Sequence, residues 1–339
     1  MKWPRSLCRF ALVWLTLLLL SFAPHASAAD GTVRLYVAFS PGGALDVAAR
    51  ALAREAEKEL GKNIFIQNVP SGGGMTGVTK LIESSPDGST LAACVSNALI
   101  FIPSRNDAPY GIQDVEPLLT FGQASPVLVT RPDAPWKDMD AFLEATRRRA
   151  GSMRIGVPGL GTPSHIALAI MAADDPSLKW RFVPFGGSGE AEAALLGGHV
   201  DAAASGALPR MKNGQLRPML TLAGARLPSL PDVPSLSDKG LADPGRGDST
   251  FLLLAPAKTP ENALDALSRA FQKAAESDAY RKALEGFSVA PALRNRQEAK
   301  DFLQRAWREE GNILKAAGIA DRSAALPSGE NAGKNSHAE

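Results

Sequence analysis

Short apolar segments alternate with amphipathic segments along the first third of the chain. Runs rich in Val, Ile, Leu and Phe predict strands at 33–39, 63–67 and 89–95. Between them, apolar residues at helical spacing predict helices over 44–60 and 75–84. This order indicates βαβ units, so we expect an α/β fold with mainly parallel sheets flanked by helices.

Some predicted strands end in a glycine-containing loop that leads directly into a predicted helix. The pattern occurs at 33–53, 154–171 and 181–196. Glycine lets a ligand approach the backbone closely, and a helix N-terminus offers bare N–H groups and about half a positive charge. We therefore expect several helix ends to converge on one small acidic molecule.

The first 29 residues predict a cleavable signal peptide. Basic residues precede an apolar run at 10–20, and the small-residue site Ala-Ser-Ala follows at 26–28. A membrane anchor is the alternative, but the apolar run is shorter than the ~20 residues that a spanning helix needs. We expect export to the periplasm.

About 310 residues remain after the signal peptide, which suits two α/β domains. The segments 126–135 and 251–263 resemble each other, because each is an apolar strand followed by a proline-bounded turn. Paired strands of this kind suit a hinge, with the ligand between two lobes. The expected division is lobe one at 30–128 plus 252–320, lobe two at 129–251, and a flexible polar tail at 321–339.

Charge and cysteine content narrow the class of protein. Removing the three basic residues of the signal peptide from the 37 in the chain leaves 34 against 35 acidic residues, a net charge of −1. No basic run interleaved with aromatic residues is present, so we expect no nucleic-acid partner. Cys8 lies in the signal peptide, and Cys94 lies in an apolar run where cysteine behaves as a small buried hydrophobe.

The sequence gives little support for a metal site, a nucleophile–base pair or a dinucleotide-binding loop. His165 and His199 lack the spacing of a metal site, and Ser164 and His165 point about 100° apart on a helix, so they form no nucleophile–base pair. The segment 72–77 fits G-x-G-x-x-G, but free NAD is not expected outside the cytoplasm and no acidic residue lies about 20 residues further on. We expect no cofactor, no metal and no catalytic residue.

The motif FSPGG at 39–43, followed by Asp46 and Arg50, resembles the opening of the Bug (TctC-like) family. These are extracytoplasmic solute-binding receptors of tripartite tricarboxylate transporters. The likeness continues through NVPSGGG at 68–74, GLGTPSH at 159–165 and other short motifs. The resemblance implies a two-lobed periplasmic-binding-protein fold (Venus flytrap, type II-like), capture of a small carboxylate and delivery to permease subunits by a monomer.

In that family the ligand carboxylate is held by main-chain amides, hydroxyls and water near the P-G-G-x-x-D loop. Asp46 here either caps its own helix or contacts the ligand, and both roles can hold. For His165 we favour a packing or polar-network role over ligand contact. The candidate ligand-binding residues of the loops are Gly42, Gly43, Asp46, Gly73, Gly74, Ser96, Asn97, Gly161, Thr162, Ser164, His165, Gly187 and Ser188.

None of these candidate loops contains Arg or Lys. Family members often carry P-Y-K-G where this chain has PFGG at 184–187, which removes a hydroxyl and a positive charge. The sequence therefore favours a less charged or more apolar acid as ligand. A periplasmic sensor that docks to a receptor ectodomain, and an exported hydrolase, are the alternative functions.

Overall fold

The computed structural model describes residues 31–104, 108–149, 151–241, 248–285, 287 and 289–316. The predicted signal peptide and the tail at 321–339 lie outside the described residues. None of the described helices combines the length and the apolar character that a bilayer-spanning segment needs.

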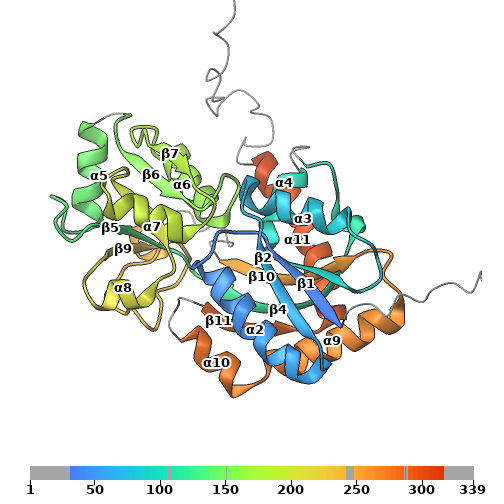
Figure 1. The fold of residues 1–339 in the computed structure, drawn as a ribbon. Coiled ribbons are helices and arrows are strands. Elements are labelled where there is room, and N and C mark those ends of the chain that lie inside the picture. Colours follow the sequence, from blue (N-terminus) through green and yellow to red (C-terminus); the bar gives the residue numbers. More distant parts are fainter. Residues whose placement is uncertain are drawn as a thin grey trace, which may run out of the picture. The chain divides into compact units, whose positions relative to one another are not determined.

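Within the described residues, the first sheet has six strands in the order β11-β4-β10-β3-β1-β2 (Figure 1). Strands β1 and β3 are parallel, whereas β10 runs antiparallel to both β3 and β4, and β11 runs antiparallel to β4. The bounds are β1 Thr32–Val37, β2 Asn63–Asn68, β3 Thr90–Val95, β4 Val115–Ala124, β10 Ser249–Pro256 and β11 Val289–Arg294.

The helices associated with this sheet come from both ends of the chain. Helix α2 packs against α9 and α10, α3 contacts β3, and α11 contacts β4. Their bounds, with the short 3₁₀ turns, are α2 Ala44–Leu60, η1 Gly72–Gly74, α3 Met75–Ile82, η2 Ser96–Ala98, α4 Phe101–Ser104, η3 Ile112–Asp114, α9 Glu261–Ala275, α10 Asp278–Leu284 and α11 Arg296–Ala316.

The second sheet, green to yellow in Figure 1, has five strands among the described residues, in the order β7-β6-β8-β5-β9. Strand β6 is parallel to β7 and β8, while β5 is antiparallel to β8 and β9. The bounds are β5 Val127–Thr130, α5 Met139–Arg148, β6 Arg154–Val157, α6 Pro163–Asp174, β7 Arg181–Pro184, α7 Ser188–Leu196, β8 Ala202–Ser205, α8 Leu208–Lys212, β9 Arg217–Thr221 and η4 Ser237–Lys239.

The expected elements of the first third are confirmed, with their ends displaced by at most two residues. The two-lobed α/β fold is confirmed as well, but both sheets are mixed rather than mainly parallel. The reason is that strands which follow a change of sheet, such as β5 and β10, enter antiparallel to their neighbours.

The chain passes from the first sheet to the second in a short link rather than within a strand. Strand β4 of the first sheet ends at Ala124 and β5 of the second begins at Val127, so the expected crossing points at 128 and 252 lie inside β5 and β10. These two strands do not pair with each other in the described structure, since β5 pairs with β8 and β9, and β10 with β3 and β4. Asp248, just before β10, accepts hydrogen bonds from Gln123 and Ser125 and so ties the start of β10 to the end of β4 and the link that follows it.

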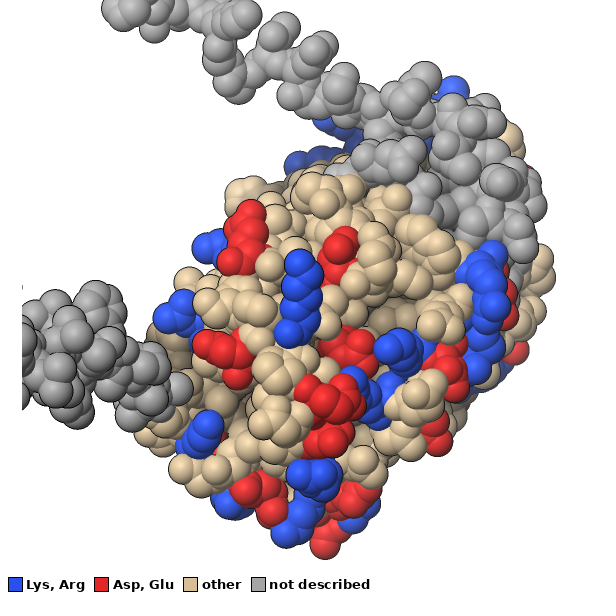
Figure 2. Space-filling model, turned by 90° about the vertical axis from the view of Figure 1, so that its right-hand side faces the viewer, with Lys and Arg blue, Asp and Glu red and all other residues tan. Residues whose placement is uncertain are grey.

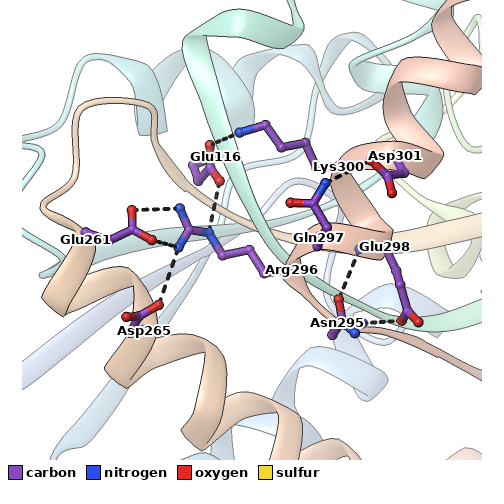
Figure 3. A network of polar contacts seen from close by, with 9 residues as sticks. All are labelled: Glu116, Glu261, Asp265, Asn295, Arg296, Gln297, Glu298, Lys300 and Asp301. Carbon is purple, nitrogen blue, oxygen red and sulfur yellow. Dashed lines mark hydrogen bonds and ion pairs between the residues drawn. The ribbon is translucent and has the colours of Figure 1, made fainter.

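An ion-pair network fixes the start of α11 to the first sheet (Figure 3). The Arg296 guanidinium lies 2.9 Å from Glu116 of β4 and also contacts Glu261 and Asp265 of α9. Asn295 and Glu298 form a reciprocal cap, with N–O distances of 3.0 and 2.9 Å. Elsewhere on the face that Figure 2 shows, Lys and Arg side chains alternate with Asp and Glu and form no single-sign patch.

Candidate functional site

A pocket with a cavity volume of about 70 Å³ lies where the N-termini of α2, α6 and α7 meet. We call it the central pocket. Elements of both sheets line it, as does Pro126 of the link between β4 and β5. The lining residues are Phe39, Gly43, Ala44, Leu45, Val95, Ala124, Pro126, Pro158, Thr162, Pro163, Ser164, Ser188, Ala204, Ser205, Gly206, Ser249 and Phe251.

The loop before α2 is shaped by two glycines. Gly42 has a φ of 81°, in the left-handed region that favours glycine, and Gly43 is the extended N-cap of α2. The first hydrogen bond of the helix runs from the Val47 amide to the Gly43 carbonyl at 3.0 Å. The amides of Ala44 and Leu45 therefore have no acceptor within the helix, and both residues line the central pocket.

The other two helices begin in the same way. Thr162 is the N-cap of α6 with Pro163 in the first turn, and Gly187 is the N-cap of α7. The Thr162 hydroxyl donates to the Gly159 carbonyl at 2.8 Å and accepts no hydrogen bond from the first turn of α6. The first-turn amides of Ser164 and Ser188 thus add unsatisfied donors beside the central pocket.

None of the described residues that line the central pocket carries a charged side chain. Its polar groups are hydroxyls and helix-end amides, and its apolar wall includes Phe39, Val95 and Phe251. Backbone donors and the partial positive charge of helix N-termini favour an anionic group. The pocket can therefore hold an acid at one end and a hydrocarbon body beside it.

Asp46 is buried behind the loop rather than exposed in the central pocket. Its oxygens accept from the Gly42 amide at 2.9 Å and the Asn68 amide group at 2.8 Å, and the Arg50 Nε lies 3.0 Å away. Both carboxylate oxygens are engaged within lobe one. This geometry fits the helix-stabilising role among the two expected for Asp46, and it holds Gly42 and Gly43 in place.

His165 also has a supporting position. Its Nδ1 accepts from the Gly161 amide at 3.1 Å, and its ring packs edge-on against Phe182 with centroids 4.8 Å apart. These contacts are those of a packing and polar-network residue. Its neighbour Ser164 lines the central pocket, with its hydroxyl 3.4 Å from that of Thr162.

Other candidate residues line a second pocket, which we call the glycine pocket. It is lined by loops 70–73 and 159–161, together with 75, 101–102, 184–186 and 190. Gly73, with a φ of 64°, and Gly161 lie here, not in the central pocket. A Cβ added at Gly73 would lie 2.6 Å from the Leu160 carbonyl oxygen, so glycine here permits one loop to contact the other.

The remaining candidates support this contact. The Asn97 side chain donates to the Gly73 carbonyl at 3.0 Å, and Gly74 packs against Phe39 and Ala98. Ser96 is buried at the start of η2. The glycine run at 72–74 is thus a 3₁₀ turn built against a neighbouring loop.

The loops of the two sheets are joined next to the central pocket. The Ser40 amide donates to the Gly186 carbonyl at 2.9 Å, and the Ser40 hydroxyl donates to the Glu190 carboxylate. The same carboxylate accepts from the Gly186 amide at 3.0 Å. Gly187 packs on Ser40, where an added Cβ would lie 3.1 Å from the Ser40 nitrogen.

Sequence reasoning missed one side of the central pocket, at Ser205, Gly206 and Ser249. Ser205 is the last residue of the alanine-rich strand β8 and Gly206 follows it, so a Ser-Gly pair at the end of an apolar strand was the available signal. Behind them lies Glu192 of α7, only 4 % exposed, which accepts from the Ser205 hydroxyl at 2.6 Å. Burial raises the pKa of Glu192, while the hydrogen bond from Ser205 and the charge of Arg210 oppose that rise.

Comparisons with known sequences identify a family and relatives of this chain. The sequence model described as "Tripartite tricarboxylate transporter family receptor" matches residues 48–319. The UPF0065 protein in the gbd 5'region of Cupriavidus necator is 29% identical over 291 residues, which are 85% of this chain and 88% of that protein. Protein BugT of Bordetella pertussis is 27% identical over 295 residues, covering 84% and 89% of the two chains.

Solved structures show the same fold. A chain described as a periplasmic transporter is 26% identical, with a TM-score of 0.78 over 85% of this chain and 97% of its own. MatC from Rhodopseudomonas palustris, solved with bound malate, is 25% identical, with a TM-score of 0.75 over 84% and 98%. The periplasmic binding protein BugD, at 21% identity and a TM-score of 0.76, has the same fold over 85% of this chain and 98% of its own.

Proposed function

Because this chain belongs to the tripartite tricarboxylate transporter receptor family, we propose that its central pocket captures a small organic acid by one carboxylate. The observation that carries this proposal is the meeting of three helix N-termini at a pocket whose described lining contains no charged side chain. Amides and hydroxyls then take the place of a salt bridge.

Hydrogen bonds of this kind are strong enough to account for micromolar affinity. Each hydrogen bond to a charged group contributes roughly 1.5–3 kcal/mol, and a micromolar complex needs about 8 kcal/mol. The amides of Ala44 and Leu45, with the hydroxyls of Ser164 and Ser188, provide several such donors. The malate bound in MatC supports a carboxylate as the recognised group.

Only some of the candidate residues contact the ligand in this proposal. Gly43, Thr162, Ser164 and Ser188 line the central pocket and are direct contacts, together with the amides of Ala44 and Leu45. Four other candidates hold the contacting loops in shape: Gly42, Asp46, Gly187 and His165. The remaining five form the loop contact beside the pocket: Gly73, Gly74, Ser96, Asn97 and Gly161.

Capture requires the pocket to open and close. The lobes in this proposal follow the sheets, so that the chain enters lobe two after Ala124 and returns to lobe one at about Asp248. Contacts such as Ser40 with Gly186 join the lobes beside the ligand. Bending of the two links would break these contacts and open the pocket.

The proposed location and partners are those typical of the family. Relatives of this chain include periplasmic binding proteins, and the segment at 1–29 would export it by the same route. The closed, loaded form would dock as a monomer on permease subunits of a tripartite transporter. Within this proposal the protein binds its acid without transforming it.

A thermal-shift screen of the chain from residue 30 onward tests the proposal. The panel contains mono-, di- and tricarboxylates, with the matching amides as uncharged controls. A ligand at 100 times its dissociation constant adds about 2.7 kcal/mol to the free energy of unfolding. Stabilisation by an acid but not by its amide supports carboxylate capture, and silence towards all acids in ligand-free protein contradicts it.

A further inference from the structure

We propose that the central pocket selects a monocarboxylate that carries a hydroxyl or another hydrogen-bond donor, and rejects dicarboxylates, because Ser205 backed by Glu192 gives one wall an acceptor character. This inference rests on the proposed function and names the class of acid.

The hydrogen bonds of Ser205 leave it only an acceptor role towards the pocket. Its Oγ donates to the Glu192 Oε1 at 2.6 Å and accepts from the Ala207 amide at 3.1 Å. A hydroxyl has one proton and two lone pairs. The proton and one lone pair are therefore in use, and the remaining lone pair is what Ser205 can offer a ligand.

Glu192 lies between the Ser205 hydroxyl and the Arg210 guanidinium, two groups that favour its ionised form against the effect of burial. The Ser205 hydroxyl faces one of its oxygens, and the Arg210 Nε lies 3.6 Å from the other. An ionised carboxylate only accepts hydrogen bonds, so it fixes the direction of the Ser205 proton away from the pocket. Its negative charge also lies one hydrogen bond behind the pocket wall.

Two further acidic side chains lie near the central pocket. Asp46 and Glu190 lie in the first turns of α2 and α7, two of the helices that line it. The cations paired with Asp46 and Glu192 are Arg50 and Arg210, and both are 43% exposed at their side chains. A second carboxylate in the pocket would meet acceptors and acidic neighbours, with no Lys or Arg in the described lining.

The remaining wall suits a hydrocarbon body. Phe39, Leu45, Val95 and Phe251 line the central pocket and are nearly or fully buried. One end of the pocket thus provides donors from helix ends, one wall provides the Ser205 acceptor, and the rest is apolar. A hydroxy acid with a single carboxylate complements all three.

Four acids with a common carbon skeleton test the effect of the hydroxyl and of the second carboxylate separately. Butyrate, 3-hydroxybutyrate, succinate and malate differ only in the presence of the hydroxyl and of the second carboxylate. By titration calorimetry we expect 3-hydroxybutyrate to bind at least about tenfold more tightly than malate, because like charges repel strongly at a desolvated site. We also expect it to bind more tightly than butyrate.

Two variants test whether Ser205 and Glu192 cause this ligand preference. In Glu192→Gln, which removes the negative charge, we expect the preference for 3-hydroxybutyrate over malate to fall to within about threefold. In Ser205→Ala, we expect the advantage of 3-hydroxybutyrate over butyrate to disappear. Glu144→Gln is the control, because Glu144 is an exposed carboxylate paired with Arg148. Unchanged preferences in folded Glu192→Gln and Ser205→Ala would overturn the inference.

The ligand preferences of the wild-type protein test the inference even if the variants do not fold. If the acid that stabilises best in the broad screen has another length, the same four-way set is made at that length. Tighter binding of the dicarboxylates overturns this inference and leaves the proposed function intact. Absence of binding by every carboxylate overturns the proposed function itself, and with it the assignment of this ligand class.

Discussion

The Ser40 amide donates a hydrogen bond to the Gly186 carbonyl across 2.9 Å, although the two residues belong to loops of different sheets. Glu190 reinforces the contact, because its carboxylate accepts from both the Ser40 hydroxyl and the Gly186 amide. One acidic side chain at the start of α7 therefore joins the two loops that flank the central pocket.

Loss of this contact should weaken ligand binding. In Ser40→Ala the backbone hydrogen bond remains, but the charge-assisted bond to Glu190 is lost. We expect about a tenfold increase in Kd, because such a bond contributes about 1.5 kcal/mol. Glu190→Gln should have a smaller effect in the same direction. Titration calorimetry measures both, with Glu144→Gln as control. An unchanged Kd in Ser40→Ala would show that the contact does not contribute to closure.

The buried Glu192 should make stability fall with rising pH. Burial raises its folded-state pKa above the ordinary value of 4.5, so the folded protein retains a proton that the unfolded chain has released. The contribution of Glu192 to the free energy of unfolding therefore decreases as pH rises above about 4.5. Glu192→Gln lacks this titration and should gain stability relative to the wild type over the same range.

Urea unfolding of both proteins from about pH 4 to 7 isolates this effect, since all other titrating groups are shared and cancel in the difference. A difference that stays constant across the range, or that changes in the opposite direction, would count against a desolvated carboxylate at this position.

Cys94 should be inert in the native protein. It is a free cysteine, fully buried in β3, and burial raises the pKa of its thiol well above the ordinary range. For the chain from residue 30 onward, we expect labelling by a thiol reagent to be negligible without denaturant and to follow global unfolding. Rapid labelling under native conditions would reveal local opening of the first sheet.

Ligand affinity should depend only weakly on salt. No described residue that lines the central pocket is Lys or Arg, and hydrogen bonds from amides and hydroxyls are little affected by ionic screening. We expect Kd to change by less than about twofold between about 0.05 and 0.5 M NaCl. A steep loss of affinity with salt would require a cationic contact outside the described lining.

The local elements of the fold were predictable because their signals are local. The helix at Ala44–Leu60 agrees with its predicted bounds, since a glycine stands just outside each end. The strand order was not predictable in the same way. The apolar runs at Val127 and Phe251 are similar as sequence, and only tertiary pairing decides that they belong to different sheets.

The candidate site was predictable in part for the same reason. A glycine loop before a helix is visible in sequence, and it identified Gly43, Thr162 and Ser188 as neighbours of the central pocket. Ser205 and Glu192 come together by the packing of α7 on β8, which leaves no mark in the sequence around either residue. The glycines at 72–74 carry the same signal as the loop before α2, yet their left-handed turn packs against another loop.

The central claim is that helix-end amides hold the carboxylate, and removing one amide tests it most directly. Proline is tolerated in the first turn of a helix, and Gly43, with φ −79° and ψ 168°, already has the conformation that precedes proline. Ala44→Pro therefore deletes one donor beside the pocket, while Ala44→Gly retains it. Asp278→Pro makes the same change at the start of α10, after the extended N-cap Ser277 and outside the described pocket lining.

Titration of the best acid from the screen into these variants gives the answer. We expect Ala44→Pro to remain folded and to bind about ten- to a hundredfold more weakly, the loss of one hydrogen bond to a charged group. Ala44→Gly and Asp278→Pro should bind like the wild type. Wild-type affinity in folded Ala44→Pro would contradict carboxylate capture by the N-terminus of α2.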